Sequence, residues 1–337
     1  MTSKELVFKT LEFRNNGRAP RQLWSLPWAH ENYPNEIKAI IEDYPSDFAG
    51  APGFLSESPV TSGDACKPGT FIDEWGCIFE NRQNGYIGEV KEPIIADEDW
   101  EDARKVHVPV ELLTIDPDKI NRWCNENSNW FIFGGCCPRP FEQIQFMRGS
   151  EQLYIDLMEK PAGLMQMLDR MHTFYCDLFE RWAKTDVDAL NIMDDWGAQK
   201  SLLISPESWR SIFKPMYKDY IDIAHRYGKK IFMHSDGFTL SIIPDLIDLG
   251  LDALNTQIFC IGVDKLAEFK GKLTFWGEID RQHLLPYGTP EDIRKAVESV
   301  HATLWQDGGC IAQCEFGPGG KPDNVRMVYE TWDRLTM

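Results

Sequence analysis

Short apolar runs alternate with longer amphipathic stretches along most of the chain. A short apolar run between turn residues is typical of a buried strand, whereas apolar residues spaced three and four apart are typical of a helix. The pattern predicts eight strands, and helical segments separate them from the third strand onward. The predicted strands are Arg21–Leu26, Asp47–Gly50, Trp130–Gly134, Ala189–Met193, Lys230–His234, Ala253–Gln257, Leu273–Gly277 and Cys310–Gln313.

Two of the intervening helices have clear boundary signals. Ser205 is expected to cap a helix that has Pro206 in its first position and ends at Gly228. Thr289 is expected to cap a second helix, which begins at Pro290 and ends before the Gly308–Gly309 pair. One apolar stripe along this second helix is predicted to face the core: Ile293, Ala296, Val297, Val300 and Leu304.

The repetition of strand and helix predicts an α/β fold with a parallel sheet. Eight such units favour a TIM (β/α)8 barrel, and barrels of this length are commonly one domain, so residues 1–337 are expected to form a single domain. A doubly wound sheet is the alternative. That alternative is weaker, because no glycine-rich dinucleotide-binding motif follows any predicted strand.

Residues 60–95 do not fit the strand–helix repeat. Two β-type segments, Phe71–Glu80 and Tyr86–Val90, flank the turn-rich stretch "NRQNG". This pattern predicts a β-hairpin, inserted between the second and third strands of the barrel.

Composition and charge narrow the class of partner. Over the 337 residues the net charge is −18, which argues against binding to nucleic acid and to anionic membrane surfaces. No stretch approaches the roughly 20 apolar residues of a membrane helix. The start, "MTSKELVFKTLEF", lacks the apolar core of a signal peptide, and the nine cysteines have no regular spacing. We therefore expect a cytoplasmic protein with reduced thiols and a small-molecule partner.

Polar residues follow the predicted strands, where a barrel of this kind carries its chemistry. After the fourth strand come Asp194, Asp195, Trp196 and Gln199. The alternative role of the two aspartates is to cap the helix that follows. Because adjacent strand residues face opposite sides, at most one of them is expected to face the barrel axis. An aromatic wall and an amide would suit an uncharged or cationic ligand.

The segment "FMHSDG" presents His234 and Asp236 at the end of the fifth strand. Two side chains two positions apart lie on the same face of a strand. Imidazole and carboxylate are both zinc ligands, and Cys314 at the end of the last strand is the expected third ligand. A core histidine without a ligand, or a substrate-binding pair, remains open as an alternative.

Several longer segments resemble one known superfamily. They are "FEQIQFMRGSEQLYIDLMEKP", "LNIMDDWGAQKSLLISPESWRSIFKP", "FMHSDGFTLSIIPDLIDLGLDALNTQ", "LTFWGEID", "GTPEDI" and "KPDNVRMVYE". The chain resembles the uroporphyrinogen decarboxylase superfamily, and within it the less characterised bacterial branch. That superfamily has a TIM-barrel fold and also contains zinc-dependent methyltransferases that act with corrinoid proteins.

The sequence departs from the motifs of both activities, decarboxylation and methyl transfer. Porphyrinogen decarboxylases carry an "RQAGR"-type segment that holds the substrate carboxylates, whereas this chain reads "GRAPRQLWSLPWA", with only Arg18 and Arg21. The methyltransferases bind zinc through His-x-Cys and a distant Cys. His234 and Cys314 match the outer members of that set, and Asp236 stands where the family has cysteine.

The resemblance therefore implies a methyltransferase that moves a methyl group from a small methoxylated or N-methylated compound to a corrinoid protein. Zinc at His234, Cys314 and Asp236 and cobalamin carried by the partner are the implied cofactors, and a homodimer is possible. A decarboxylase-type lyase and a non-catalytic binding barrel are the alternatives. In the preferred reading Asp194 or Asp195 protonates the leaving group or holds a cationic nitrogen. The remaining candidates shape the cavity or orient the substrate: Trp75, Trp196, Trp276, Gln199, Gln257 and Glu278.

Overall fold

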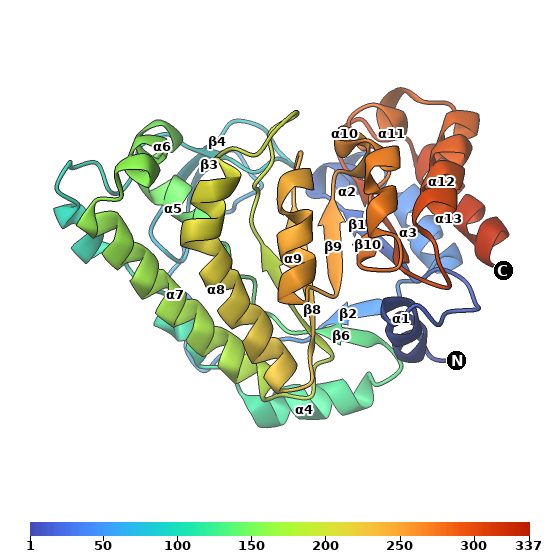
Figure 1. The fold of residues 1–337 in the computed structure, drawn as a ribbon, viewed down its shortest axis with the longest axis horizontal. Helices are drawn as coiled ribbons and strands as arrows, with labels where there is room; N and C mark the ends of the chain where they lie inside the picture. Colours follow the sequence, from blue (N-terminus) through green and yellow to red (C-terminus); the bar gives the residue numbers. More distant parts are fainter.

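Eight parallel strands form one sheet in the computed structural model, which describes all residues 1–337 (Figure 1). Their order in space is β1-β11-β10-β9-β8-β7-β6-β2, as in a TIM barrel. Each of the eight overlaps one of the predicted strands, so the predicted fold class is confirmed. The strands are β1 (Arg21–Ser25), β2 (Phe48–Gly50), β6 (Phe131–Phe133), β7 (Ala189–Met193), β8 (Lys230–Ser235), β9 (Ala253–Thr256), β10 (Thr274–Trp276) and β11 (Cys310–Phe316).

The barrel closes between β1 and β2 through Asp47. The backbone N–H of Asp47 donates to the Arg21 carbonyl at 2.9 Å, and the Asp47 carboxylate accepts from the Arg21 N–H at 2.7 Å. The Arg18 guanidinium donates to both oxygens of the same carboxylate, at 2.6 and 2.7 Å. Arg18 and Arg21 therefore belong to the seam of the barrel, where Arg21 also pairs with Asp333.

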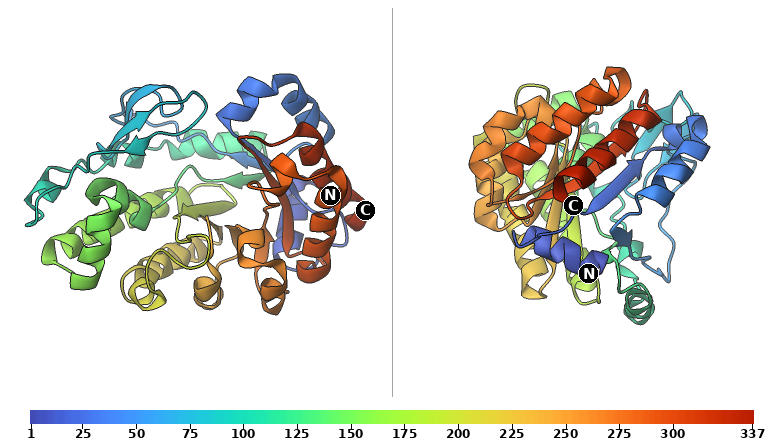
Figure 2. Two further views of the ribbon diagram at one scale, coloured as in Figure 1. Left: turned by 90° about the horizontal axis from the view of Figure 1, so that it is seen from above. Right: turned by 90° about the vertical axis from the view of Figure 1, so that its right-hand side faces the viewer.

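Helices surround the barrel and connect successive strands (Figure 2). Both predicted caps are present, because Ser205 accepts from the Ser208 N–H and Thr289 forms a capping box with Asp292. No helix is both long enough and apolar enough to cross a membrane. The α-helices are α1 (Ser3–Leu11), α2 (Pro27–Asn32), α3 (Pro34–Asp43), α4 (Pro117–Glu126), α5 (Pro140–Arg148), α6 (Ser150–Glu159), α7 (Ala162–Ala183), α8 (Pro206–Arg226), α9 (Ile243–Leu249), α10 (Ile258–Ile261), α11 (Leu284–Tyr287), α12 (Pro290–Leu304) and α13 (Pro322–Thr336). Short 3-10 helices are η1 (Glu101–Lys105), η2 (Val110–Leu113), η3 (Leu240–Ile242) and η4 (Val263–Phe269).

The apolar residues form two separate cores. The larger core lies between the sheet and the surrounding helices, and it includes the predicted stripe of α12. The smaller core fills the inside of the barrel, and α1 contributes Val7 and Leu11 to it. The ring of Phe8 packs edge-on against Phe131 at 5.2 Å, so α1 covers the end of the barrel where the strands begin. The opposite end is left for polar side chains.

The inserted segment between β2 and β6 forms a three-stranded antiparallel sheet, β3 (Gly69–Ile72), β4 (Ile78–Asn81) and β5 (Glu89–Val90). The predicted hairpin corresponds to β4 and β5, and β3 adds a further strand. Phe79 packs on Phe146 of α5, and Trp75 packs on Phe174 and Tyr175 of α7. The sheet, coloured cyan in Figure 2, therefore rests on helices and adds no strand to the barrel.

Candidate functional site

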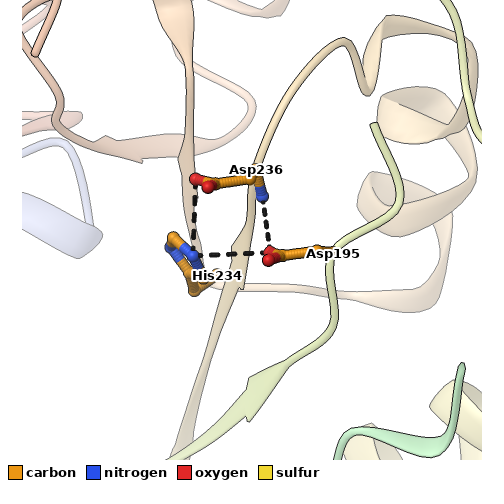
Figure 3. Close-up of side chains that lie close together, drawn as sticks. All are labelled: Asp195, His234 and Asp236. Carbon is orange, nitrogen blue, oxygen red and sulfur yellow. Dashed lines mark hydrogen bonds and ion pairs between the residues drawn. The ribbon is translucent and has the colours of Figure 1, made fainter. Parts of the chain in front are cut away.

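Asp195, His234 and Asp236 face one another where β7 and β8 end (Figure 3). His234 Nε2 lies 3.6 Å from Asp195 Oδ1 and 3.6 Å from Asp236 Oδ1. The Asp236 N–H donates to Asp195 Oδ1 at 2.9 Å, which holds the two acidic residues together. This is the grouping in the chain with the residue types and spacing of a metal site.

Strand alternation places His234 and Asp236 on the inner face of β8. Phe232 belongs to the core inside the barrel, whereas Ile231 and Met233 belong to the core under the helices. Residues two apart share a face, so His234 and Asp236 follow Phe232 inward. The ring of Trp24 packs edge-on against the imidazole at 5.4 Å and forms part of the floor of the site.

Asn255 of β9 determines the tautomer of His234. Asn255 Oδ1 lies 2.6 Å from His234 Nδ1, while Asn255 Nδ2 donates to the Trp276 carbonyl and to Gln313 Oε1. Because both of those partners are acceptors, the amide orientation is determined, and Nδ1 must carry the proton that Asn255 accepts. In the neutral ring, Nε2 then presents its lone pair to the two carboxylates.

The electrostatics of this group call for a positive charge between its atoms. Burial and, after it, the charge of Asp236 raise the pKa of Asp195. Asp236 Oδ1 is buried and has no hydrogen-bond partner. A lone pair and two carboxylate oxygens at close range repel one another, so either a proton on Nε2 or a metal ion satisfies the arrangement.

The three atoms also fit the dimensions of a zinc site. All lie within 4.8 Å of one another. Ligand atoms around a tetrahedral zinc are about 3.4 Å apart, given zinc–ligand distances near 2.1 Å. The two 3.6 Å separations from His234 Nε2 are close to that value. Nitrogen and oxygen ligands without thiolate also suit other divalent transition metals.

Arg281, in the loop after β10, carries three carboxylate partners. Its guanidinium donates to Asp236 Oδ2 and to Glu315 Oε2, the latter at 2.6 Å, and its Nε lies 3.4 Å from Glu278 Oε1. Burial alone would lower the pKa of Arg281, but the charges of these carboxylates raise it. The guanidinium therefore links the group of Asp195, His234 and Asp236 to Glu278. Its single positive charge is shared among three carboxyl groups.

A cavity of about 220 Å³ is bordered by Arg281, which pairs with Asp236, while Asp195, His234 and Asp236 themselves are not part of its lining. Three of the predicted substrate-binding residues line this cavity: Gln199, Gln257 and Glu278. Glu278 is only 3% exposed, burial raises its pKa well above the usual range, and its Oε2 has no hydrogen-bond partner. The full lining is Gln199, Gln257, Ile258, Phe259, Cys260, Glu278, Asp280, Arg281, Gln282 and His283.

The structure does not bring Cys314 into the group with His234. The expectation that Cys314 is the third zinc ligand is therefore corrected. Along β11, Gln313 and Glu315 face inward, where they contact Asn255 and Arg281. Cys314 therefore faces outward, and it lies in the core under the helices. Burial there raises the pKa of its thiol, so the thiolate needed for zinc binding is disfavoured. Asp195 occupies the place in the group that was expected for the cysteine.

Asp194 is a helix cap and not a catalytic group facing the cavity. Its fully buried carboxylate accepts from the N–H groups of Phe141 and Glu142, at 3.1 and 2.7 Å, and from the Tyr217 hydroxyl at 2.8 Å. Burial raises the pKa of Asp194, and these three hydrogen bonds oppose that shift. It thus caps α5 from the end of β7, and of the adjacent pair only Asp195 faces the axis.

None of the three predicted tryptophans lines the cavity. Trp75 lies in the insertion, packed on α7. Trp196 is buried outside the barrel, stacked on Phe141 at 4.3 Å. Trp276 is inside the barrel, where its indole N–H donates to Gln22 Oε1 at 2.6 Å and its ring packs on Trp24. Trp276 therefore supports the floor of the site from below.

The predicted site residues did not include Arg281, Glu315 or Asn255. A signal existed in "GEIDRQH", where an arginine follows two acidic residues after a predicted strand. A second signal existed in "CIAQCEF", where the polar residues Gln313 and Glu315 lie two positions apart and therefore on the face opposite to Cys314.

Comparisons with known proteins give a family match and a shared fold. Residues 73–335 match the family described as Uroporphyrinogen decarboxylase (URO-D). No curated protein matches the chain. A solved methyltransferase from Methanosarcina mazei aligns over 100% of both chains, with a TM-score of 0.66 and 15% identity, and shows that the fold is shared. An endo-beta-1,4-xylanase from Gloeophyllum trabeum reaches a TM-score of only 0.38 at 9% identity, covering 64% of this chain and 79% of that chain.

Proposed function

The chain belongs to the uroporphyrinogen decarboxylase family, and we propose that it is a methyltransferase of that family. It would take a methyl group from a small methoxylated or N-methylated compound and transfer it to a corrinoid protein. The observation that carries the proposal is the His–Asp–Asp group of Asp195, His234 and Asp236, which Arg281 connects to a small polar cavity. The full-length fold likeness to a methyltransferase supports it.

In this proposal, His234 Nε2 and one oxygen each of Asp195 and Asp236 hold a divalent metal, with zinc the first candidate. When bound, the metal would act as a Lewis acid that polarises the heteroatom carrying the methyl group. Asn255 keeps the proton on His234 Nδ1, and Arg281 holds Asp236 in place. Gln199, Gln257 and Glu278 would orient the donor, and the corrinoid of a partner would approach through the open end of the barrel.

Two features disfavour the porphyrinogen-decarboxylase alternative. Arg18 and Arg21, which lie where that activity would need arginines, pair with Asp47 and Asp333 at the barrel seam. The one arginine of the cavity, Arg281, already has three carboxylate partners. A tetrapyrrole with up to eight carboxylates would find no free cation here, and the cavity of about 220 Å³ is smaller than typical sites for drug-sized ligands.

The test combines metal content with methyl transfer. Metal is measured in the purified protein and in the His234→Ala and Asp236→Asn variants, with Cys314→Ala as the matched control. Methylation of free cob(I)alamin by a panel of methyl ethers and methylamines is then followed by absorbance. We expect one metal per chain, lost in the first two variants and kept in the control, together with methylation by at least one donor.

Other outcomes would redirect the assignment. A metal-free protein that decarboxylates a porphyrinogen would establish the lyase and overturn the proposal. A protein that binds small molecules but turns over neither class of substrate, with affinity unchanged in His234→Ala, would establish a non-catalytic binding barrel.

A further inference from the structure

We infer that Arg281 is a positioning residue for the metal site, because it holds one oxygen of Asp236 and leaves the other as the only ligand atom of that side chain. Such a site should select a metal that binds imidazole and few oxygens, such as zinc, over calcium. The inference rests on the metal site of the proposed function and adds to it the feature of the chain that selects the metal. It depends neither on the methyl donor nor on the methyl acceptor.

The two carboxylate oxygens of Asp236 have different surroundings. Its Oδ2 accepts a hydrogen bond from Nη2 of Arg281. Its Oδ1 is buried, has no hydrogen-bond partner and lies 3.6 Å from His234 Nε2. That separation is close to the distance of about 3.4 Å between two ligand atoms of a tetrahedral zinc. Asp236 therefore directs one oxygen toward the imidazole and gives the other to the guanidinium.

Arg281 is in turn anchored to β11. Its Nη1 donates to Glu315 Oε2 at 2.6 Å, and its Nε lies 3.4 Å from Glu278 Oε1. Because a guanidinium is planar and its N–H groups point in fixed directions, one that is anchored by Glu315 cannot turn to follow Asp236. A rotation of Asp236 that brought both of its oxygens to the metal would therefore break a hydrogen bond between two charged groups.

The backbone of Asp236 is fixed as well. Its N–H donates to Asp195 Oδ1 at 2.9 Å, and the same oxygen of Asp195 lies 3.6 Å from His234 Nε2. The backbone contact with Asp195 and the side-chain contact with Arg281 together hold Asp236 in one orientation toward the imidazole. The spacing of the three ligand atoms follows from that orientation.

This ligand set favours some metals over others. Zinc is bound tetrahedrally by nitrogen, oxygen or sulfur atoms, and imidazole also suits cobalt and other transition metals. Calcium takes roughly six to eight oxygen ligands and often uses both oxygens of a carboxylate. One imidazole nitrogen and a carboxylate limited to one oxygen do not meet that requirement. Without Arg281, Asp236 could turn both oxygens to the ion, which would raise the coordination number and bring the affinity for calcium closer to that for zinc.

The experiment uses the purified full-length protein, freed of metal by a chelator and then titrated with zinc, cobalt(II) or calcium. Isothermal titration calorimetry gives each affinity. The visible spectrum of the cobalt form reports the coordination geometry, since tetrahedral cobalt(II) absorbs far more strongly than octahedral cobalt(II). Each measurement is made on the wild type, Arg281→Gln and Arg281→Lys. Arg104→Gln is the matched control, because the Arg104 side chain is 77% exposed and pairs with Glu101 at the surface.

We expect the wild type to bind zinc at least about 100-fold more tightly than calcium and to give a strongly absorbing, tetrahedral cobalt form. Arg281→Gln should lower the zinc affinity at least about tenfold, reduce the ratio of zinc to calcium affinity by a similar factor and weaken the cobalt absorbance. Arg281→Lys should behave in the same way, because one ammonium cannot hold Asp236 and Glu315 in the directions of the guanidinium. Arg104→Gln should match the wild type.

A merely structural role of Arg281 would lower the stability of the protein without changing the affinity ratio or the cobalt spectrum. An unchanged ratio and spectrum in folded Arg281→Gln, or wild-type behaviour of Arg281→Lys, would overturn the inference. The wild-type measurements need no variant. An octahedral cobalt spectrum, calcium bound as tightly as zinc, or no metal binding at all would therefore overturn it even if the variants fold poorly.

The two proposals fail in different ways. If the metals and the variants behave as expected but no donor methylates cob(I)alamin, methyl transfer is wrong and the role of Arg281 stands. If cob(I)alamin is methylated while folded Arg281→Gln keeps the wild-type spectrum and affinity ratio, the enzyme is a methyltransferase and the inference about Arg281 is wrong.

Discussion

Gly197 and Gly237 lie backbone to backbone, so that a Cβ on Gly237 would overlap the Gly197 carbonyl. The Gly197 N–H donates to the Asp236 carbonyl at 3.0 Å, and the Phe238 N–H donates to the Ala198 carbonyl at 2.9 Å. This contact joins the loops that follow β7 and β8. It is what brings Asp195 of one loop beside Asp236 of the other.

A side chain at Gly197 should therefore separate the two carboxylates. We expect Gly197→Ala to lower the free energy of unfolding by about 2 kcal/mol, because its Cβ would overlap backbone atoms that cannot move easily. It should also weaken metal binding at least about tenfold. Gly50→Ala is the control, since a Cβ there meets nothing within 4 Å. Unchanged metal affinity in a folded Gly197→Ala protein would show that the loop contact does not position the site.

The choice of ligands can be read from metal content alone. His234→Ala should abolish stoichiometric metal binding, whereas Cys314→Ala should leave it unchanged, because the Cys314 side chain lies in the core under the helices. Inductively coupled plasma mass spectrometry on the purified proteins measures both. Loss of metal in Cys314→Ala, with the thermal midpoint unchanged, would contradict the strand orientation described here.

Asn255 should affect metal binding through its hydrogen bond with His234. Removing the acceptor in Asn255→Ala frees the imidazole to rotate and to change tautomer, so we expect metal affinity to fall by about 10- to 100-fold. Competition with a chelator of known affinity measures the change. Asn32→Ala, at an exposed position in α2, serves as the control. Equal metal affinity in Asn255→Ala and Asn32→Ala would show that Asn255 does not position His234 for metal binding.

Asp194 should affect folding and not metal binding. In Asp194→Ala the N–H groups of Phe141 and Glu142 and the Tyr217 hydroxyl lose their acceptor. We expect the free energy of unfolding in urea to fall by about 3 kcal/mol, because buried donors are left unpaired. The folded fraction should still bind one metal per chain. Metal loss from protein that remains folded would point instead to a direct role.

Asp252, directly before β9, should make a pH-dependent contribution to the stability of the fold. Its carboxylate bonds His225, Lys230 and the Ile231 N–H, and although burial opposes them, these partners lower its pKa. A lowered folded-state pKa contributes stability above the unfolded value of about 3.9, and this is lost as pH falls through the folded value. Asp252→Asn should cost about 2 kcal/mol at pH 7, and the difference should shrink below about pH 4.

Urea unfolding of the wild type and Asp252→Asn across that pH range tests this expectation. Asp248→Asn, at an exposed position in α9, is the control and should show no such trend. A difference between wild type and Asp252→Asn that stayed constant down to acid pH would mean that ionisation of Asp252 is not the source.

Local patterns along the chain were enough to predict the barrel and half of its site. Strands could be predicted because each is a short apolar run between turn residues, and the α12 stripe because its apolar spacing follows the helical period. The spacing of His234 and Asp236 placed both on one face of β8, whatever the rest of the chain does. For these features the relevant distances lie within a few residues along the chain.

Which face of each strand turns inward, and which distant loops meet, depends on how the whole chain packs. In β11 the polar residues Gln313 and Glu315 alternate with Cys314, but both faces of the strand are buried, and the alternation by itself did not tell which face turns to the axis. Asp194 and Asp195 are alike as residues, but one meets the start of α5 and the other meets His234. Arg281 acquires its partners from β8 and β11, across the open end of the barrel. Such contacts depend on register and packing between segments far apart in the chain, and local sequence does not encode them.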